Sequence, residues 1–219
     1  MATTNSNRGK PKQIDLAVLE TAEWYKGDRT TTVRSFMPLL TQMVYDNPNW
    51  FHYATFMGSN SFAEALENLV HKDGVNYIYI GTHGEDDKIQ GFLPGDSHPN
   101  KTTWERCFSK GALRGIFLGG CEMNFLAGKI SSLLTRSTHN PPPWVAGYWK
   151  SIDWMDATML DLAFLREALN PKVNSEKAIK GVLNKLEGKG YGGIMESLGF
   201  TVYIGGKEIY FGDKETAFG

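Results

Sequence analysis

Residues 77–87, YIYIGTHGEDD, join four residues of strand-forming character to a sharp turn that carries a histidine. A second segment, Gly115–Asn124 (GIFLGGCEMN), repeats this pattern with a cysteine in place of the histidine. In each segment, an apolar run with the length of a buried strand ends in glycine and leads to a chemically reactive side chain. We therefore expect His83 and Cys121 each to follow the carboxyl end of a strand.

Strand-like and helix-like segments alternate along the chain around these two turns. Five apolar runs have the length of strands: Ile14–Leu19, Trp50–Thr55, Tyr77–Ile80, Gly115–Leu118 and Trp144–Tyr148. Six segments have apolar residues at helical spacing: Val33–Tyr45, Ser61–Val70, Thr102–Lys110, Phe125–Leu134, Asp153–Leu169 and Ser175–Leu186. This alternation predicts an α/β fold, with a mostly parallel sheet flanked by helices on both faces.

Three shorter segments complete the expected secondary structure. Phe200–Ile204 and Lys207–Phe211 are separated by two glycines, which predicts a C-terminal β-hairpin. Lys88–Leu93 is interpreted as a hairpin arm after the histidine turn, and the glycine-rich Gly190–Gly193 as a turn. We expect residues 13–219 to form a single domain, and residues 1–12 to be a disordered lead-in.

The composition is that of an ordinary globular protein, with 41% hydrophobic and 21% charged residues. The formal net charge is −1, so no overall field attracts nucleic acid or an anionic membrane. No run approaches the roughly 18 consecutive apolar residues that a membrane span needs. Two cysteines in 219 residues suit a reducing compartment. We expect a cytoplasmic protein with neither a nucleic-acid nor a membrane partner.

The expected fold gives the two turns a common location. In open parallel sheets, functional groups collect beyond the carboxyl ends of the strands. Strands that are consecutive in sequence are neighbours about two-thirds of the time. The side chains of His83 and Cys121 can therefore meet across one cleft.

A cysteine beside a histidine is suited to nucleophilic acyl transfer. The imidazole takes the thiol proton, stabilises the thiolate and later protonates the leaving amine. The backbone N–H groups of Gly84 and Cys121 are candidate donors to the oxyanion that forms during attack. Gly119 and Gly120 would allow a substrate backbone to approach closely.

The strand ending in His83-Gly84 and the strand ending in Gly119-Gly120-Cys121 resemble the dyad of caspase-like (clan CD) cysteine peptidases. That group includes caspases, metacaspases, gingipains, separases and bacterial CHAT domains. Trp144–Leu165 supports the resemblance, because in the bacterial branches a strand here leads into a wall of the substrate pocket and then a long helix. The early strand with Glu20 and Trp24 also fits that topology.

The resemblance covers about residues 14–169 and is nearest to the bacterial caspase-like and CHAT-type domains. It implies a cysteine endopeptidase that cleaves a protein or peptide substrate through an acyl-enzyme, without a cofactor. By the same analogy, an activating partner protein is expected.

The sequence departs from true caspases in three ways. The residues before Cys121 are Gly-Gly rather than Gln-Ala. The sequence separation between His83 and Cys121 is shorter than the roughly 50 residues that separate the histidine and the cysteine in caspases. A long linker for cleavage into two subunits is also lacking, so we expect a single uncut chain. Arg-directed members of the group use an acidic pocket for the P1 residue. Candidates to line such a pocket here are Asp86, Asp87, Glu122 and Asp153, with Trp154 as a wall, which would favour a basic P1 residue.

Other interpretations remain open at the level of sequence. Taken singly, a structural histidine is the better interpretation of His83, and a buried inert thiol is the usual interpretation of Cys121. The acids at 85–87 are interpreted as a solvated turn. Cys107 lies within an expected helix and is assigned to the core, and the remaining histidines show no metal-ligand spacing. The alternatives to a peptidase are a catalytically silent caspase-like protein-binding module and a small-amide hydrolase. An open groove would favour peptides, and a closed cavity small amides.

Overall fold

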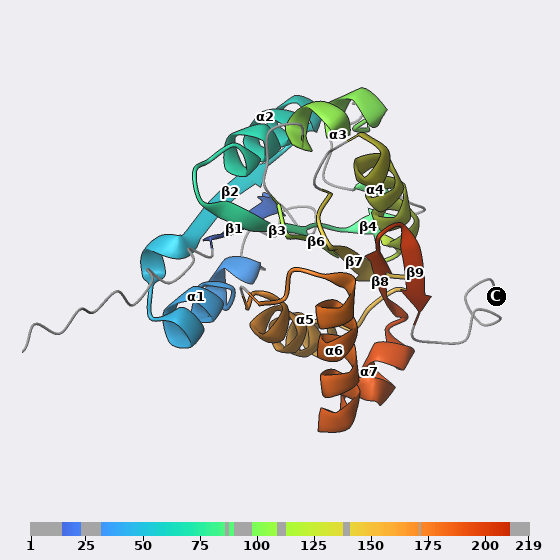
Figure 1. Ribbon diagram of the computed structural model, residues 1–219. Helices are drawn as coiled ribbons and strands as arrows, with labels where there is room; N and C mark the ends of the chain where they lie inside the picture. The colour runs from blue at the N-terminus through green and yellow to red at the C-terminus, as the bar shows by residue number, and fades with distance from the viewer. Residues whose placement is uncertain are drawn as a thin grey trace, which may run out of the picture.

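The computed structural model describes residues 15–22, 32–85, 88–89, 98–108, 113–137, 141–170 and 172–210, which form an α/β fold around one large sheet (Figure 1). The sheet has seven strands in the order β2-β1-β3-β6-β7-β8-β9. Their bounds are β1 Asp15–Thr21, β2 Phe51–Phe56, β3 Val75–Gly81, β6 Gly115–Gly119, β7 Trp144–Tyr148, β8 Phe200–Ile204 and β9 Lys207–Tyr210. Strands β2, β1, β3, β6 and β7 are parallel to one another.

Helices cover both faces of the sheet, as the sequence predicts (Figure 1). On one face lie α2 (Ser59–Val70), α3 (Lys101–Phe108) and α4 (Asn124–Ser137). On the other lie α1 (Pro38–Tyr45), α5 (Trp154–Ala168), α6 (Glu176–Leu186) and α7 (Gly192–Ser197). The 3₁₀ turns η1 (Val33–Ser35) and η2 (Pro48–Trp50) flank α1, and the π-helical segment η3 (Glu187–Tyr191) joins α6 to α7.

Strand β1 shows why the sequence of the sheet is so apolar. Leu16 and Val18 belong to the hydrophobic core on the α5 side, whereas Ala17 and Leu19 belong to the core on the α2 side. All four side chains are completely buried. Because helices cover both faces, the strand is a continuous apolar run without polar alternation.

The C-terminal hairpin is confirmed. β8 is antiparallel to β7 and β9 is antiparallel to β8, with Ile204 opposite Lys207. Gly205 and Gly206 form the turn with φ of 56° and 75°, the left-handed conformation that two-residue hairpin turns require. The hairpin arm expected at Lys88–Leu93 begins as β5 (Lys88–Ile89), which pairs with β4 (Gly84–Glu85). The rest of that arm lies outside the described residues.

Three expectations about helices are corrected. The helix expected over Val33–Tyr45 is divided into η1 and α1, because Pro38 occupies the first turn of α1 and lacks an N–H. Helix α2 begins before Ser61, whose hydroxyl accepts a hydrogen bond from the Met57 N–H at 3.0 Å. The turn expected at Gly190–Gly193 belongs to a helical segment, although Gly190 interrupts it with a φ of 89°.

Among the helices that the structure describes, none combines the length and the apolar character needed to cross a membrane.

Candidate active site

The register of β3 and β6 brings His83 and Cys121 to the same edge of the sheet. These strands are parallel neighbours, and their last paired residues are Gly81 and Gly119. Each reactive residue follows its glycine at the same distance along the chain. The N–H of Thr82 continues the pairing by donating to the carbonyl oxygen of Gly119 at 3.3 Å. The expectation that both residues follow the carboxyl ends of adjacent strands is thus confirmed.

The two turns pack backbone against backbone. A Cβ placed on Gly84 would overlap the carbonyl oxygen of Cys121 and the side chain of Met123. On the opposite turn, a Cβ on Gly120 would overlap the carbonyl oxygen of Thr82. Only glycine fits at either position without moving one turn away from the other.

The sulfur of Cys121 faces polar groups from the loop that follows β7. Cys121 is half-buried, and its Sγ accepts a hydrogen bond from the backbone N–H of Ile152 at 3.4 Å. The hydroxyl of Ser151 lies 3.9 Å from the same sulfur. Helix α4 starts shortly after the cysteine, at Asn124, so its positive end lies close by in the chain. The contacts with Ser151 and Ile152 hold the sulfur beside the loop that follows β7.

The backbone around each reactive residue is fixed locally. Glu122 adopts a left-handed conformation with a φ of 53°, and its N–H donates to the carbonyl oxygen of Lys150 at 3.2 Å. On the other turn, the buried hydroxyl of Thr82 donates to the carbonyl oxygen of His83 at 3.2 Å. Gly84 then enters the short pairing of β4 with β5.

Three of the residues expected to line a substrate pocket, Glu122, Asp153 and Trp154, lie within the described part of the chain. Glu122 directly follows Cys121 and is half-buried. Asp153 is the N-cap of α5, since its Oδ1 accepts hydrogen bonds from the N–H groups of Met155 at 2.9 Å and Asp156 at 3.1 Å. Trp154 is half-buried, and its ring packs edge-on against Phe36 with a centroid distance of 6.4 Å. Asp86 and Asp87 lie outside the described residues.

The role expected for Gly119 and Gly120 is wrong. Both were expected to let a substrate backbone approach, but the space beside each is filled by the protein itself. A Cβ on Gly119 would overlap the hydroxyl and ring of Tyr79, and Gly120 faces the Thr82 carbonyl oxygen. These glycines allow close internal packing beneath the site.

A buried acid lies under the sheet near this edge and was not found from the sequence. The carboxylate of Asp161, on α5, accepts hydrogen bonds from the hydroxyls of Tyr79 on β3, at 2.7 Å, and Tyr148 on β7. Burial raises the pKa of Asp161 to about 7, although both tyrosine hydroxyls oppose this shift. Burial and the adjacent carboxylate raise the pKa of both tyrosines well above the usual value. An acid within the apolar stripe of a helix was the sequence signal for this network.

Glu20 forms a second buried acidic group, at the end of β1. Its carboxylate accepts hydrogen bonds from the Val33 N–H at 2.7 Å, the Thr32 hydroxyl at 2.7 Å and the Tyr53 hydroxyl at 2.6 Å. Burial and this hydrogen bond raise the pKa of Tyr53 to about 12. Glu20 therefore connects β1 to β2 and to the start of η1. Trp24, which the resemblance to caspase-like peptidases pairs with Glu20, lies outside the described residues.

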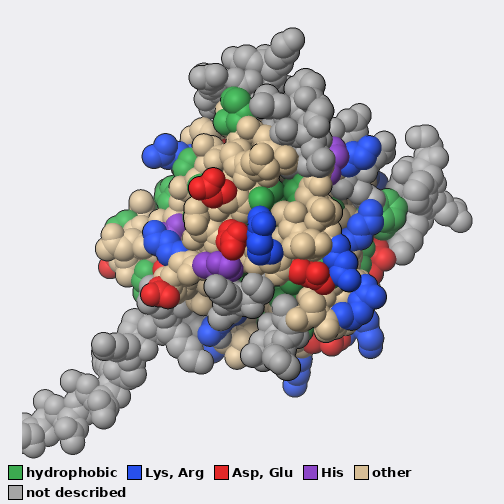
Figure 2. All heavy atoms as spheres, turned by 90° about the horizontal axis from the view of Figure 1, so that it is seen from above, with side chains coloured by type: hydrophobic (Ala, Val, Ile, Leu, Met, Phe, Trp, Pro, Cys, Tyr) green, Lys and Arg blue, Asp and Glu red, His purple; other side chains and the backbone are tan. Residues whose placement is uncertain are grey.

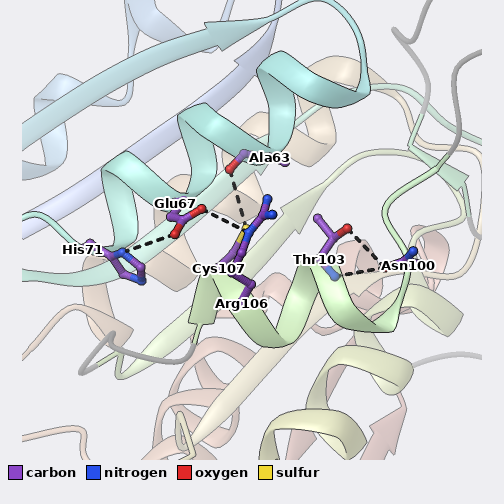
Figure 3. Close-up of polar contacts among 7 residues, drawn as sticks. All are labelled: Ala63, Glu67, His71, Asn100, Thr103, Arg106 and Cys107. Atoms are coloured by element: carbon purple, nitrogen blue, oxygen red, sulfur yellow. Dashed lines mark hydrogen bonds and ion pairs between the residues drawn. The ribbon is translucent and has the colours of Figure 1, made fainter.

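Cys107 belongs to the core, as the sequence predicts. It is completely buried between α3 and α2, where its Sγ lies 3.6 Å from the carbonyl oxygen of Ala63 (Figure 3). Burial raises the pKa of its thiol to about 11, so the thiolate is disfavoured near neutral pH. Within the described ranges, no group of three or more His, Cys, Asp or Glu side chains is arranged to hold a metal ion.

No family model matches the chain, and no curated protein matches its sequence.

Proposed function

We propose that the chain is a cysteine endopeptidase in which Cys121 is the nucleophile and His83 the general base and acid. The observation that carries this proposal is the register of β3 and β6, which pairs Gly81 with Gly119 and so brings the two turns to one edge. The N–H of Ile152, 3.4 Å from the Cys121 sulfur, supports the proposal because it holds the sulfur at this edge of the sheet. Cys107 is too deeply buried to take that role.

In this mechanism, His83 takes the proton from Sγ, and the thiolate attacks the carbonyl carbon of the scissile peptide bond. The negative charge on the carbonyl oxygen is stabilised by the backbone N–H groups of Gly84 and Cys121. His83 then gives its proton to the leaving amine as the C–N bond breaks, leaving a thioester on Cys121. A water molecule that loses a proton to His83 attacks the thioester, which releases the acid and restores the thiol.

The acid closest in sequence to the nucleophile favours a basic P1 residue. Glu122 directly follows Cys121, and its left-handed backbone holds it within the same turn. The Oδ1 of Asp153 is already occupied as a helix cap, so Glu122 is the stronger candidate to meet a basic side chain.

Both cysteines are free thiols, which suits a protein that acts in the reducing cytoplasm.

The test is the rate of alkylation of Cys121 by iodoacetamide between pH 5 and pH 9. Every protein in this experiment also carries Cys107→Ser, so that the measured alkylation is that of Cys121. We expect rapid labelling near neutral pH, and a decrease of about tenfold or more in His83→Ala, because the imidazole no longer stabilises the thiolate. Labelling that follows an ordinary thiol midpoint near pH 8.5, and is the same in His83→Ala, would contradict the proposal.

A library of peptides that vary at P1 then separates the peptidase from its alternatives. We expect cleavage after Arg or Lys that is lost in Cys121→Ala. Fast labelling without peptide cleavage would instead favour hydrolysis of a small amide. An unreactive Cys121 would favour the silent protein-binding module.

A further inference from the structure

A groove of about 950 Å³ lies between α3 and α4, away from the candidate active site. Neither His83 nor Cys121 lines it. Its floor is apolar, because Trp104, Leu126 and Ile130 line it and are each more than nine-tenths buried. A cavity of this size with an apolar floor is typical of a binding site.

The rim of the groove is positively charged. Lys101, Lys129 and Arg136 line it, and the carboxylate among the described lining residues is that of Glu105. Glu105 lies 3.7 Å from Lys101 and offsets its charge, so the three cations and one carboxylate leave a net charge of two positive among the described lining residues. Figure 2 shows Lys and Arg side chains gathered on the right of the view, the side on which α3 and α4 lie. This local excess of cations contrasts with the net charge of −1 for the whole chain.

The walls of the groove are held in place from outside it. On the far side of α3, Arg106 forms an ion pair with Glu67 of α2 at 3.2 Å, and Cys107 contacts Ala63 (Figure 3). On α4, Gly128 leaves room for the ring of Tyr203, which closes one side of the groove. A partner would therefore bind a preformed surface and lose little free energy in ordering it.

The groove follows α4 from its first turn to its last. Phe125 and Arg136 line its two ends, which are about 16 Å apart at the helical rise of 1.5 Å per residue. That length accommodates about three turns of a partner helix. Phe125 is 45% exposed, and its ring packs edge-on against Trp149 at 4.6 Å, in the loop that supplies Ser151 and Ile152 to Cys121. One end of the groove is thus connected to the active-site loop.

We propose that this groove docks an acidic, amphipathic helical segment of a partner protein. Apolar side chains at helical spacing fill the floor over Trp104 and Ile130, and carboxylates meet the cations of the rim. A nucleic-acid strand fits less well, because Trp104, the aromatic residue of the floor, is buried and cannot stack on a base, which leaves the rings of Phe125 at one end and Tyr203 at one side. This docking surface does not depend on the proposed peptidase activity.

The probe is a fluorescein-labelled 14-residue synthetic peptide with leucines at helical spacing and glutamates on its polar face. Fluorescence anisotropy is measured with the full chain, beside the same peptide with glutamine for glutamate and a 12-nucleotide single-stranded DNA. Two variants alter the groove independently: Lys129→Glu with Arg136→Glu reverses the rim, and Ser132→Trp fills the space. Lys172→Glu with Lys177→Glu is the matched control, because it changes the charge equally at exposed sites outside the groove.

We expect the glutamate peptide to bind, and both groove variants to lower its affinity by about tenfold or more. The control variant and Cys121→Ala should bind as the unaltered protein does. The inference is overturned if no glutamate peptide binds, if either groove variant binds equally well, or if the DNA or the glutamine peptide binds more tightly. Circular dichroism confirms that each variant is folded. Because Cys121→Ala lacks the proposed nucleophile and cannot cleave the probe, binding in this variant tests docking whether or not the peptidase assignment holds.

Discussion

Gly84 is the residue on which the contact between the two turns most directly depends. A Cβ at this position would overlap the carbonyl oxygen of Cys121, which is backbone and cannot rotate away. We expect Gly84→Ala to lower the free energy of unfolding by about 1–3 kcal/mol, the usual cost of overpacking. Urea denaturation measures this loss of stability. We also expect the rate at which iodoacetamide alkylates Cys121 to change in the same variant.

Gly181→Ala is the matched control for that substitution. Gly181 lies inside α6, and a Cβ there would have no atom within 4 Å. Alanine should therefore stabilise the helix by about 0.5–1 kcal/mol. Equal effects of the two substitutions would show that the turns after β3 and β6 are not in close contact.

Asn124, the first residue of α4, has a completely buried amide. Among the described residues, neither its Nδ2 nor its Oδ1 has a hydrogen-bond partner. Leaving such a group unsatisfied costs about 1–3 kcal/mol, and an apolar residue of similar size removes that cost. We expect Asn124→Leu to raise the free energy of unfolding by about 1 kcal/mol, measured by urea denaturation. Asn184→Leu, at an exposed position of α6, should give no such gain; a loss of stability in Asn124→Leu would show that the amide is satisfied.

Among the elements, α5 holds together the strands that lead to both halves of the site. Asp161 of α5 accepts hydrogen bonds from Tyr79 of β3, which leads to His83, and from Tyr148 of β7, which leads to the loop over Cys121. Gly119 of β6 provides the space for the Tyr79 hydroxyl. A displacement of α5 would therefore move both turns.

The same network predicts how stability changes with pH. Burial raises the pKa of Asp161 from 3.8 to about 7 in the folded protein, so between these values the folded state binds a proton that the unfolded state has lost. The resulting stabilisation is complete below about pH 4 and is lost as the pH rises through 7, a change of about 4 kcal/mol. The free energy of unfolding of the unaltered protein minus that of Asp161→Asn should therefore fall by that amount as the pH rises from 4 to above 7.

Urea denaturation of both proteins at each unit from pH 4 to pH 8 measures this difference. Groups other than Asp161 titrate in both proteins and cancel on subtraction. A difference that stays constant across this range would show that the pKa of Asp161 is not raised in the folded state.

Over the whole molecule, the parts that the sequence predicts are those determined by local pattern. The strand at Tyr77–Ile80 was recognisable because burial on both faces makes it uninterruptedly apolar, and the location of His83 and Cys121 follows from where such strands end. The bond between Tyr79 and Asp161 joins residues 82 positions apart and has no local signal. Helix α7 was missed because its glycines have low helix propensity, while tertiary packing of the buried Met195 stabilises it.

Burial across the sheet also predicts which backbone amides are most protected from solvent. Tyr77 to Ile80 of β3 are at most 2% exposed and lie between the two hydrophobic cores, whereas Lys207 and Glu208 of the edge strand β9 are exposed. We expect the β3 amides to exchange with deuterium only through global unfolding, and the β9 amides about 100-fold faster through local opening. Native-state exchange monitored by NMR measures both. Added urea below the unfolding midpoint should accelerate β3 strongly and β9 little, and equal exchange in the two strands would contradict a single cooperative core built around β3.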